Sequence, residues 1–83
     1  MSFLDVSIEL PSVEGGRAEA ATIVKWLKKE GDEVREGEPV VLVEFPKIDL
    51  EVHSPASGRL TQILSKEGKM ARVGDKIGTV HVT

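Results

Sequence analysis

IVKWLKKEGDEVREGEPVVLVE, at residues 23–44, returns in altered form as LTQILSKEGKMARVGDKIGTVH at residues 60–81. The two segments align without a gap at a spacing of 37 residues, and seven aligned positions are identical. The identical pairs are Leu27/Leu64, Lys29/Lys66, Glu30/Glu67, Gly31/Gly68, Arg35/Arg72, Gly37/Gly74 and Val43/Val80. Two copies of one unit can complete each other by packing face to face, whereas an open solenoid needs three or more. The repeat therefore predicts a closed structure of two similar halves.

Each copy is expected to form a strand, a turn and a second strand. The Lys-Glu-Gly tripeptides at residues 29–31 and 66–68 each supply a glycine that can take the positive φ of a tight turn. Residues 6–10 and 48–52 alternate apolar and polar side chains, as strands with one buried face do. Composition would allow a helical edge at residues 25–29, but the frequent glycines and β-branched runs favour an all-β fold.

The composition indicates one small domain spanning residues 1–83. Cysteine is absent, which excludes disulfides and thiolate metal sites and favours the cytoplasm of a bacterium or archaeon, or the mitochondrial matrix. The net charge of −3 comes from interspersed acids and bases without a basic stripe, so no nucleic acid partner is expected. No apolar run approaches the 18 or so residues that span a bilayer, so no membrane partner is expected either.

The usual catalytic and metal-binding patterns are missing from the sequence. His53 and His81 are the only two histidines, and their spacing matches no zinc motif. His53 and Ser54 are adjacent in an expected strand, so their side chains would point to opposite faces. Gly15-Gly16 lacks the following helix of a phosphate-binding loop and is expected to be a flexible turn. No metal site and no catalytic residue is predicted.

Lys47 is the candidate functional residue because it lies in a tight reversal between two expected strands. The four residues 45–48 must turn the chain, since strand-like sequence continues on both sides. Proline favours the second position of a type I turn, so Pro46 would place Lys47 third, at the tip of the hairpin. A solvated ammonium at a tip is an accessible attachment point, although an ordinary surface lysine in a turn would give the same pattern.

Many short motifs along the chain follow one known arrangement. They are Leu10-Pro11, Gly15-Gly16, residues 19–23, Trp26, residues 29–34, Gly37, Val43-Glu44, Lys47, Glu51-Val52, Ser54-Pro55, Ser57-Gly58, Glu67-Gly68 and Val73-Gly74. In these motifs the chain resembles the lipoyl domains of 2-oxo acid dehydrogenase acyltransferases, within the biotinyl/lipoyl carrier family. The resemblance implies a flattened barrel of two four-stranded antiparallel sheets with quasi-two-fold symmetry, and a modified lysine at a hairpin tip.

The resemblance also implies a role for Lys47. Lipoate would be attached to it covalently as a swinging arm that shuttles acyl groups and electrons between the enzymes of a 2-oxo acid dehydrogenase complex. The implied partners are a lipoate ligase or lipoyl transferase, a thiamin-diphosphate 2-oxo acid decarboxylase, an acyltransferase core and dihydrolipoamide dehydrogenase. The domain would have no active site of its own, and the loop at residues 12–20 would help the decarboxylase to select it.

The residues around Lys47 differ from the usual motifs of that family. Lipoyl domains usually show Glu-Thr-Asp-Lys-Ala and biotinyl domains Ala-Met-Lys-Met, whereas this chain has Glu44-Phe45-Pro46-Lys47-Ile48. Glu44 matches the lipoyl form, and all four neighbours are expected to take part in recognition of the lysine. Two alternatives stay open: a biotin carrier domain, and an unmodified lipoyl-like module that docks a partner through this tip.

Phe45 and Ile48 are expected to expose apolar surface beside Lys47. This surface would be either a partner contact or a cap on the end of the barrel core. Phe45 is placed at the end of the hairpin rather than between the sheets, so its truncation to alanine is expected to leave the barrel folded.

Overall fold

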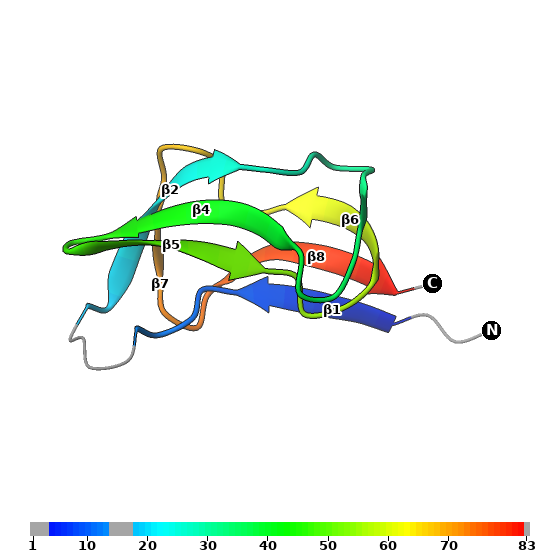
Figure 1. Ribbon diagram of the computed structural model, residues 1–83, viewed down its shortest axis with the longest axis horizontal. Coiled ribbons are helices and arrows are strands. Elements are labelled where there is room, and N and C mark those ends of the chain that lie inside the picture. Colours follow the sequence, from blue (N-terminus) through cyan, green and yellow to red (C-terminus); the bar gives the residue numbers. More distant parts are fainter. Residues whose placement is uncertain (1–3, 14–17, 83) are drawn as a thin grey trace.

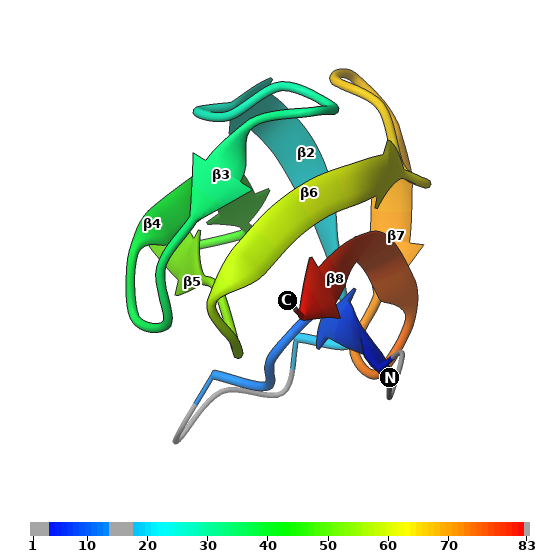
Figure 2. The ribbon, with the colours of Figure 1, turned by 90° about the vertical axis from the view of Figure 1, so that its right-hand side faces the viewer.

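Strands make up all the regular secondary structure in residues 4–13 and 18–82, which are the residues that this computed structural model describes. In chain order they are β1 (Leu4–Glu9), β2 (Ala20–Trp26), β3 (Glu33–Val34), β4 (Pro39–Phe45), β5 (Ile48–His53), β6 (Gly58–Ile63), β7 (Met70–Arg72) and β8 (Lys76–Val82). They form two four-stranded antiparallel sheets, ordered β1-β8-β6-β3 and β5-β4-β2-β7 (Figures 1 and 2). The predicted all-β architecture is confirmed. This part of the chain holds no helix that could cross a membrane.

The two sheets correspond to each other through the internal repeat. A shift of 37 residues carries β2, β3 and β4 onto β6, β7 and β8, and leaves β1 and β5 as the remaining pair. The same exchange converts the order β5-β4-β2-β7 into β1-β8-β6-β3. Each sheet thus contains strands of both copies, and the quasi-two-fold symmetry predicted from the repeat is confirmed.

Each Lys-Glu-Gly turn joins its own copy to the other one. Gly31 and Gly68 have φ values of +97° and +87°, a region that side-chain-bearing residues rarely adopt. The N–H of Gly31 donates to the carbonyl of Leu60 at 2.7 Å, and the N–H of Gly68 donates to that of Ile23 at 2.8 Å. Because these equivalent bonds run between the copies in both directions, neither half can close its turns alone.

The core lies between the two sheets and comes from inward-facing residues of both. In β4, Val41, Val43 and Phe45 are buried while the intervening Glu44 is exposed, as the two-residue period of a strand requires. Each such side chain contributes about 1.5–3 kcal/mol when it is fully buried. The largest fully buried side chains are Phe45, Ile8, Leu10, Ile23, Leu60, Ile77, Val40, Val41, Val43 and Val80.

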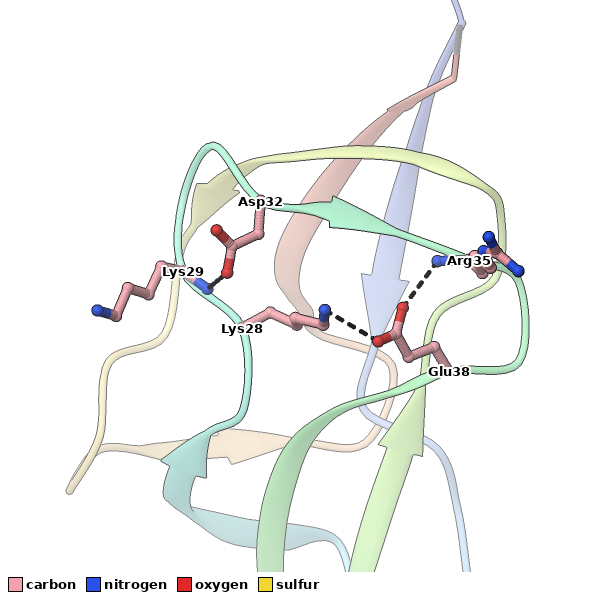
Figure 3. A network of polar contacts seen from close by, with 5 residues as sticks. All are labelled: Lys28, Lys29, Asp32, Arg35 and Glu38. Carbon is pink, nitrogen blue, oxygen red and sulfur yellow. Dashed lines mark hydrogen bonds and ion pairs between the residues drawn. The ribbon is translucent and has the colours of Figure 1, made fainter.

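A polar network ties the turn after β2 to the start of β4 (Figure 3). Glu38 accepts a hydrogen bond from the backbone N–H of Arg35 at 3.0 Å, and its other oxygen lies 2.9 Å from the Lys28 ammonium. Beside it, Asp32 accepts the backbone N–H of Lys29 at 2.9 Å. The hydrogen bond from Lys28, followed by that from Arg35, lowers the pKa of Glu38 from its ordinary value of 4.5.

This lowered pKa predicts a pH-dependent contribution to stability. A carboxyl group whose pKa is depressed by folding stabilises the native state above its unfolded pKa, and this contribution is lost as the pH falls through the folded value. Glu38→Gln should therefore flatten the fall in unfolding free energy below about pH 4.5. Urea unfolding at a series of pH values measures this, with the exposed Glu51→Gln as control. Equal slopes for Glu38→Gln and wild type would contradict the assignment.

Candidate functional site

Pro46 and Lys47 are the two residues between β4 and β5. β4 and β5 remain paired as far as this connection. Phe45 is the register partner of Ile48, and Glu44 is the register partner of Asp49. Positive φ occurs only at glycines in the described residues, so Pro46 and Lys47 both have negative φ. Turns of types II, I′ and II′ need a positive φ at one or both of these positions and are excluded, in agreement with the predicted type I turn.

Phe45 does not expose the apolar surface that the sequence led us to expect. Its side chain is only 2% exposed and belongs to the core cluster, whereas Ile48 is 48% exposed. The two-residue turn keeps Phe45 in strand register, so it points inward with Val43. Of the two readings of this aromatic ring, the cap on the end of the core is correct. Its placement outside the core was therefore wrong, and its truncation is now expected to destabilise the barrel.

Lys47 and its polar neighbours are directed to solvent. Pro46, Lys47, Glu44 and Asp49 are all exposed. Within the described residues the Lys47 ammonium has no ion pair or side-chain hydrogen bond. An exposed primary amine on a short turn between two paired strands suits modification by another enzyme. The reacting nitrogen is accessible, while the two strands hold the backbone of Lys47 in place.

The connection between β4 and β5 lies at the opposite end of the molecule from the start of β1 and the end of β8 (Figure 1). Leu4 of β1 pairs with Val82 of β8, so the described residues begin and end side by side. The principal extents of the molecule are 42 × 22 × 17 Å, and the turn projects along the longest of them. A group on Lys47 is therefore carried well away from both ends of the described chain.

A shallow hollow of about 140 Å³ lies directly beside this turn. Its lining residues come from three neighbouring strands and the turn itself; they are Ala20, Ala21, Thr22, Glu44, Phe45, Pro46 and Met70. No pattern in the sequence marks this hollow, because Met70 meets the β2 residues only when β7 pairs with β2. Ala20, the last residue of the loop at residues 12–20, lines the hollow, and residues 14–17, including Gly15-Gly16, lie outside the described part of the chain.

A larger cleft of about 660 Å³ lies between the two Lys-Glu-Gly turns, and its polar groups serve the fold. The Glu30 carboxylate accepts the backbone N–H of Ile63 at 2.8 Å, and the Glu67 carboxylate accepts that of Trp26 at 2.9 Å. The Trp26 indole N–H donates to the Ser65 carbonyl at 2.8 Å. These reciprocal bonds close the two repeat copies against each other.

Neither histidine joins a catalytic or metal-binding group in the described residues. His53 is exposed, and its neighbour Ser54 is buried and donates to the carbonyl of Ala56 at 2.7 Å. His81 lies 2.9 Å from Asp5 across the β1–β8 pair. Within the described ranges, no group of three or more histidine or acidic side chains is arranged to hold a metal ion. Lys47, the candidate from the sequence, is exposed on the turn between β4 and β5.

Sequence comparisons place nearly the whole chain in one family. The Biotin_lipoyl family, described as "Biotin-requiring enzyme", matches residues 6–80. The dihydrolipoyllysine-residue succinyltransferase component of the 2-oxoglutarate dehydrogenase complex of Rickettsia bellii is 40% identical over 78 residues. That match covers 94% of this chain and 19% of the relative, so the chain spans about a fifth of the length of this relative.

Solved structures share the fold described above. The lipoyl domain of the 2-oxoglutarate dehydrogenase complex from Azotobacter vinelandii has a TM-score of 0.67 and 27% identity, covering 89% of this chain and 95% of that domain. A single-chain, multi-domain long-chain acyl-CoA carboxylase has a TM-score of 0.76 at 20% identity, covering 95% of this chain and 7% of that one; this likeness shows the fold alone. Together with the sequence matches, these findings show that the chain belongs to the biotin/lipoyl family and is similar to its lipoyl domains.

Proposed function

We propose that this chain is a lipoyl carrier domain in which the Lys47 nitrogen forms an amide with lipoate. The observation that carries the proposal is the exposed Lys47 on the two-residue turn between β4 and β5, in a chain similar to lipoyl domains over most of its length. Biotin on the same lysine is the weaker alternative. The chain lacks the Ala-Met-Lys-Met motif, and its likeness to a carboxylase is one of fold alone.

The task of this chain is to hold and present the attached group rather than to catalyse a reaction. When bound, lipoate supplies a ring disulfide that takes up an acyl group together with two electrons. The barrel keeps the base of the arm fixed, while the arm itself stays within reach of any enzyme that touches this end of the molecule. A covalent tether holds an intermediate at a high local concentration, so weak and brief contacts with each enzyme suffice.

The proposed partners are those of a 2-oxo acid dehydrogenase complex. A lipoate ligase or lipoyl transferase would load Lys47, a thiamin-diphosphate decarboxylase would deliver the acyl group, and dihydrolipoamide dehydrogenase would restore the disulfide. The acyltransferase core would receive the acyl group. The similarity to a succinyltransferase component favours 2-oxoglutarate as the oxo acid of the decarboxylase.

Reductive acylation tests this function directly. The lipoylated chain is mixed with a 2-oxoglutarate decarboxylase and its substrate, and the mass of the chain is followed. We expect the gain of one succinyl group, and a slower reaction with pyruvate and a pyruvate decarboxylase. A lipoylated chain that neither decarboxylase acylates would contradict the carrier function.

Pro46→Asp should restore the usual acid before the lysine without harming the fold. Proline stabilises chiefly by restricting the unfolded chain, so its replacement should lower the unfolding free energy by about 0.4–1 kcal/mol. We expect the initial rate of lipoylation by a general lipoate ligase to stay level or to rise, because a carboxylate that such ligases commonly meet is regained. Mass spectrometry of timed samples gives this rate. A large fall would show that this chain has a dedicated ligase that recognises Pro46.

A further inference from the structure

The quasi-two-fold symmetry is broken on the outer face of the sheet next to Lys47. Thr22 of β2 pairs with Glu44 of β4 on one side and with Met70 of β7 on the other, so these residues form one row across the sheet. The equivalent row in the other sheet is His81, Arg59 and Glu33, joined by the same register. All three residues of that second row are polar.

The residues along the row that contains Thr22 are smaller and less polar than those of the other row, and a hollow lies beside them. At the centre of the row, Thr22 replaces a long arginine, and beside it Met70 replaces a glutamate. Thr22 and the neighbouring Ala20 are small, so they leave the hollow of about 140 Å³ between Pro46 and Met70. Met70, on the edge strand β7, is 71% exposed and is the most exposed of the large apolar residues in the described part of the chain.

We infer that the end of the arm carried by Lys47 docks in this hollow, with its sulfur-containing ring against Met70; the inference rests on the proposed lipoylation. The occupant suits the site chemically, since the ring is small, neutral and apolar, and a thioether is a soft, polarisable contact. The hollow begins at Pro46, the residue next to the attachment point. A group tethered to Lys47 therefore reaches the hollow without first having to be captured from solution.

The length of the arm matches the distance to Met70. The sheet order β4-β2-β7 sets β7 two strand spacings, about 10 Å, to the side of β4. Lys47 lies three residues beyond Glu44, which is in the row of Met70, so the path also runs up to about 10 Å along the strand and the direct distance is up to about 14 Å. A lipoyl-lysine chain has about eleven bonds between Cα and the ring, so it extends to about 14 Å. The arm can thus lie across Ala20 and Thr22 and end at Met70. A short tether gives a millimolar effective concentration, so a weak site is occupied for part of the time and still releases the arm to an enzyme.

Methionine methyl NMR tests the inference, because the chain has only two methionines, Met1 and Met70. The chain is labelled with ¹³C-methyl methionine and lipoylated, and complete loading is verified by mass. We expect the Met70 methyl signal to move on lipoylation and to show contacts with the ring protons. Thr22→Arg, which copies Arg59 of the other sheet, should abolish both effects. The matched control Arg59→Thr makes the reverse change in the other sheet and should keep them.

The rate at which a small phosphine reduces the ring disulfide provides a second measurement. Docking shields the disulfide, so the wild-type rate should be about two- to fivefold lower than that of Thr22→Arg, as expected for a site with comparable docked and free populations. In Met70→Glu, which copies Glu33, the disulfide should be reduced as fast as in Thr22→Arg. This variant replaces Thr22→Arg in the comparison if Thr22→Arg folds poorly. A loaded chain with an unmoved Met70 signal and equal reduction rates would overturn the docking and leave the carrier function standing. Failure to load Lys47 at all would overturn both.

Discussion

Phe45→Ala should lower the free energy of unfolding by about 3–5 kcal/mol, the usual loss when a buried aromatic ring is deleted from a core. The ring is 2% exposed and closes the core at the end that bears Lys47. A chain of this length has a total stability of about 4–12 kcal/mol, so the variant should lose from a quarter of its stability to nearly all of it. Urea unfolding followed by the fluorescence of Trp26 measures the difference.

Ile48→Ala is the matched control for this prediction. Ile48 is the register partner of Phe45 but is 48% exposed, so its truncation removes fewer contacts. We expect a loss of less than half that of Phe45→Ala. A Phe45→Ala variant as stable as wild type would show that the ring does not belong to the core. Because the variant is expected to be unstable, it cannot serve to separate carrier and docking functions at this tip.

Lys47→Arg should abolish lipoylation while the domain remains folded. The guanidinium keeps the positive charge but stays protonated in proteins, so it offers no amine for amide formation. The side chain is exposed and its ammonium has no partner among the described residues, so the unfolding free energy should change by less than about 0.5 kcal/mol. Intact mass after incubation with a lipoate ligase measures the loss.

Lys25→Arg tests whether replacing any exposed lysine has the same effect on lipoylation. Lys25 is also exposed, but it lies inside β2 rather than on a turn, so this variant should gain one lipoyl group as the wild type does. A lipoyl group on Lys47→Arg, located at another lysine, would show that the attachment point had been misassigned.

The repeat made most of the fold predictable from the sequence. A gapless spacing of 37 residues assigns equivalent places to β2 and β6, to β3 and β7, and to β4 and β8. The glycines at 31 and 68 mark turns because their positive φ is rare in other residues, and the structure has both. Such local signals suffice to predict the fold when the same pattern of strands and turns occurs twice in one chain.

Phe45 and the hollow show where reasoning from the sequence fell short. The alternation Val41, Val43, Phe45 points the ring inward, whereas the turn that follows suggests that the core ends before it. A two-residue turn leaves the strand intact up to Phe45, so the alternation holds there. The hollow depends on the pairing of Met70 with Thr22, residues distant in sequence, and neither one is unusual when it is read alone.

The mass of the chain isolated from its native host, grown with lipoate, tests the central claim most directly. The measurement detects the group that living cells attach, and fragmentation of the peptide that contains Lys47 locates it. The account predicts a single lipoyl group on Lys47. An unmodified chain, or one that carries biotin on Lys47, would contradict it.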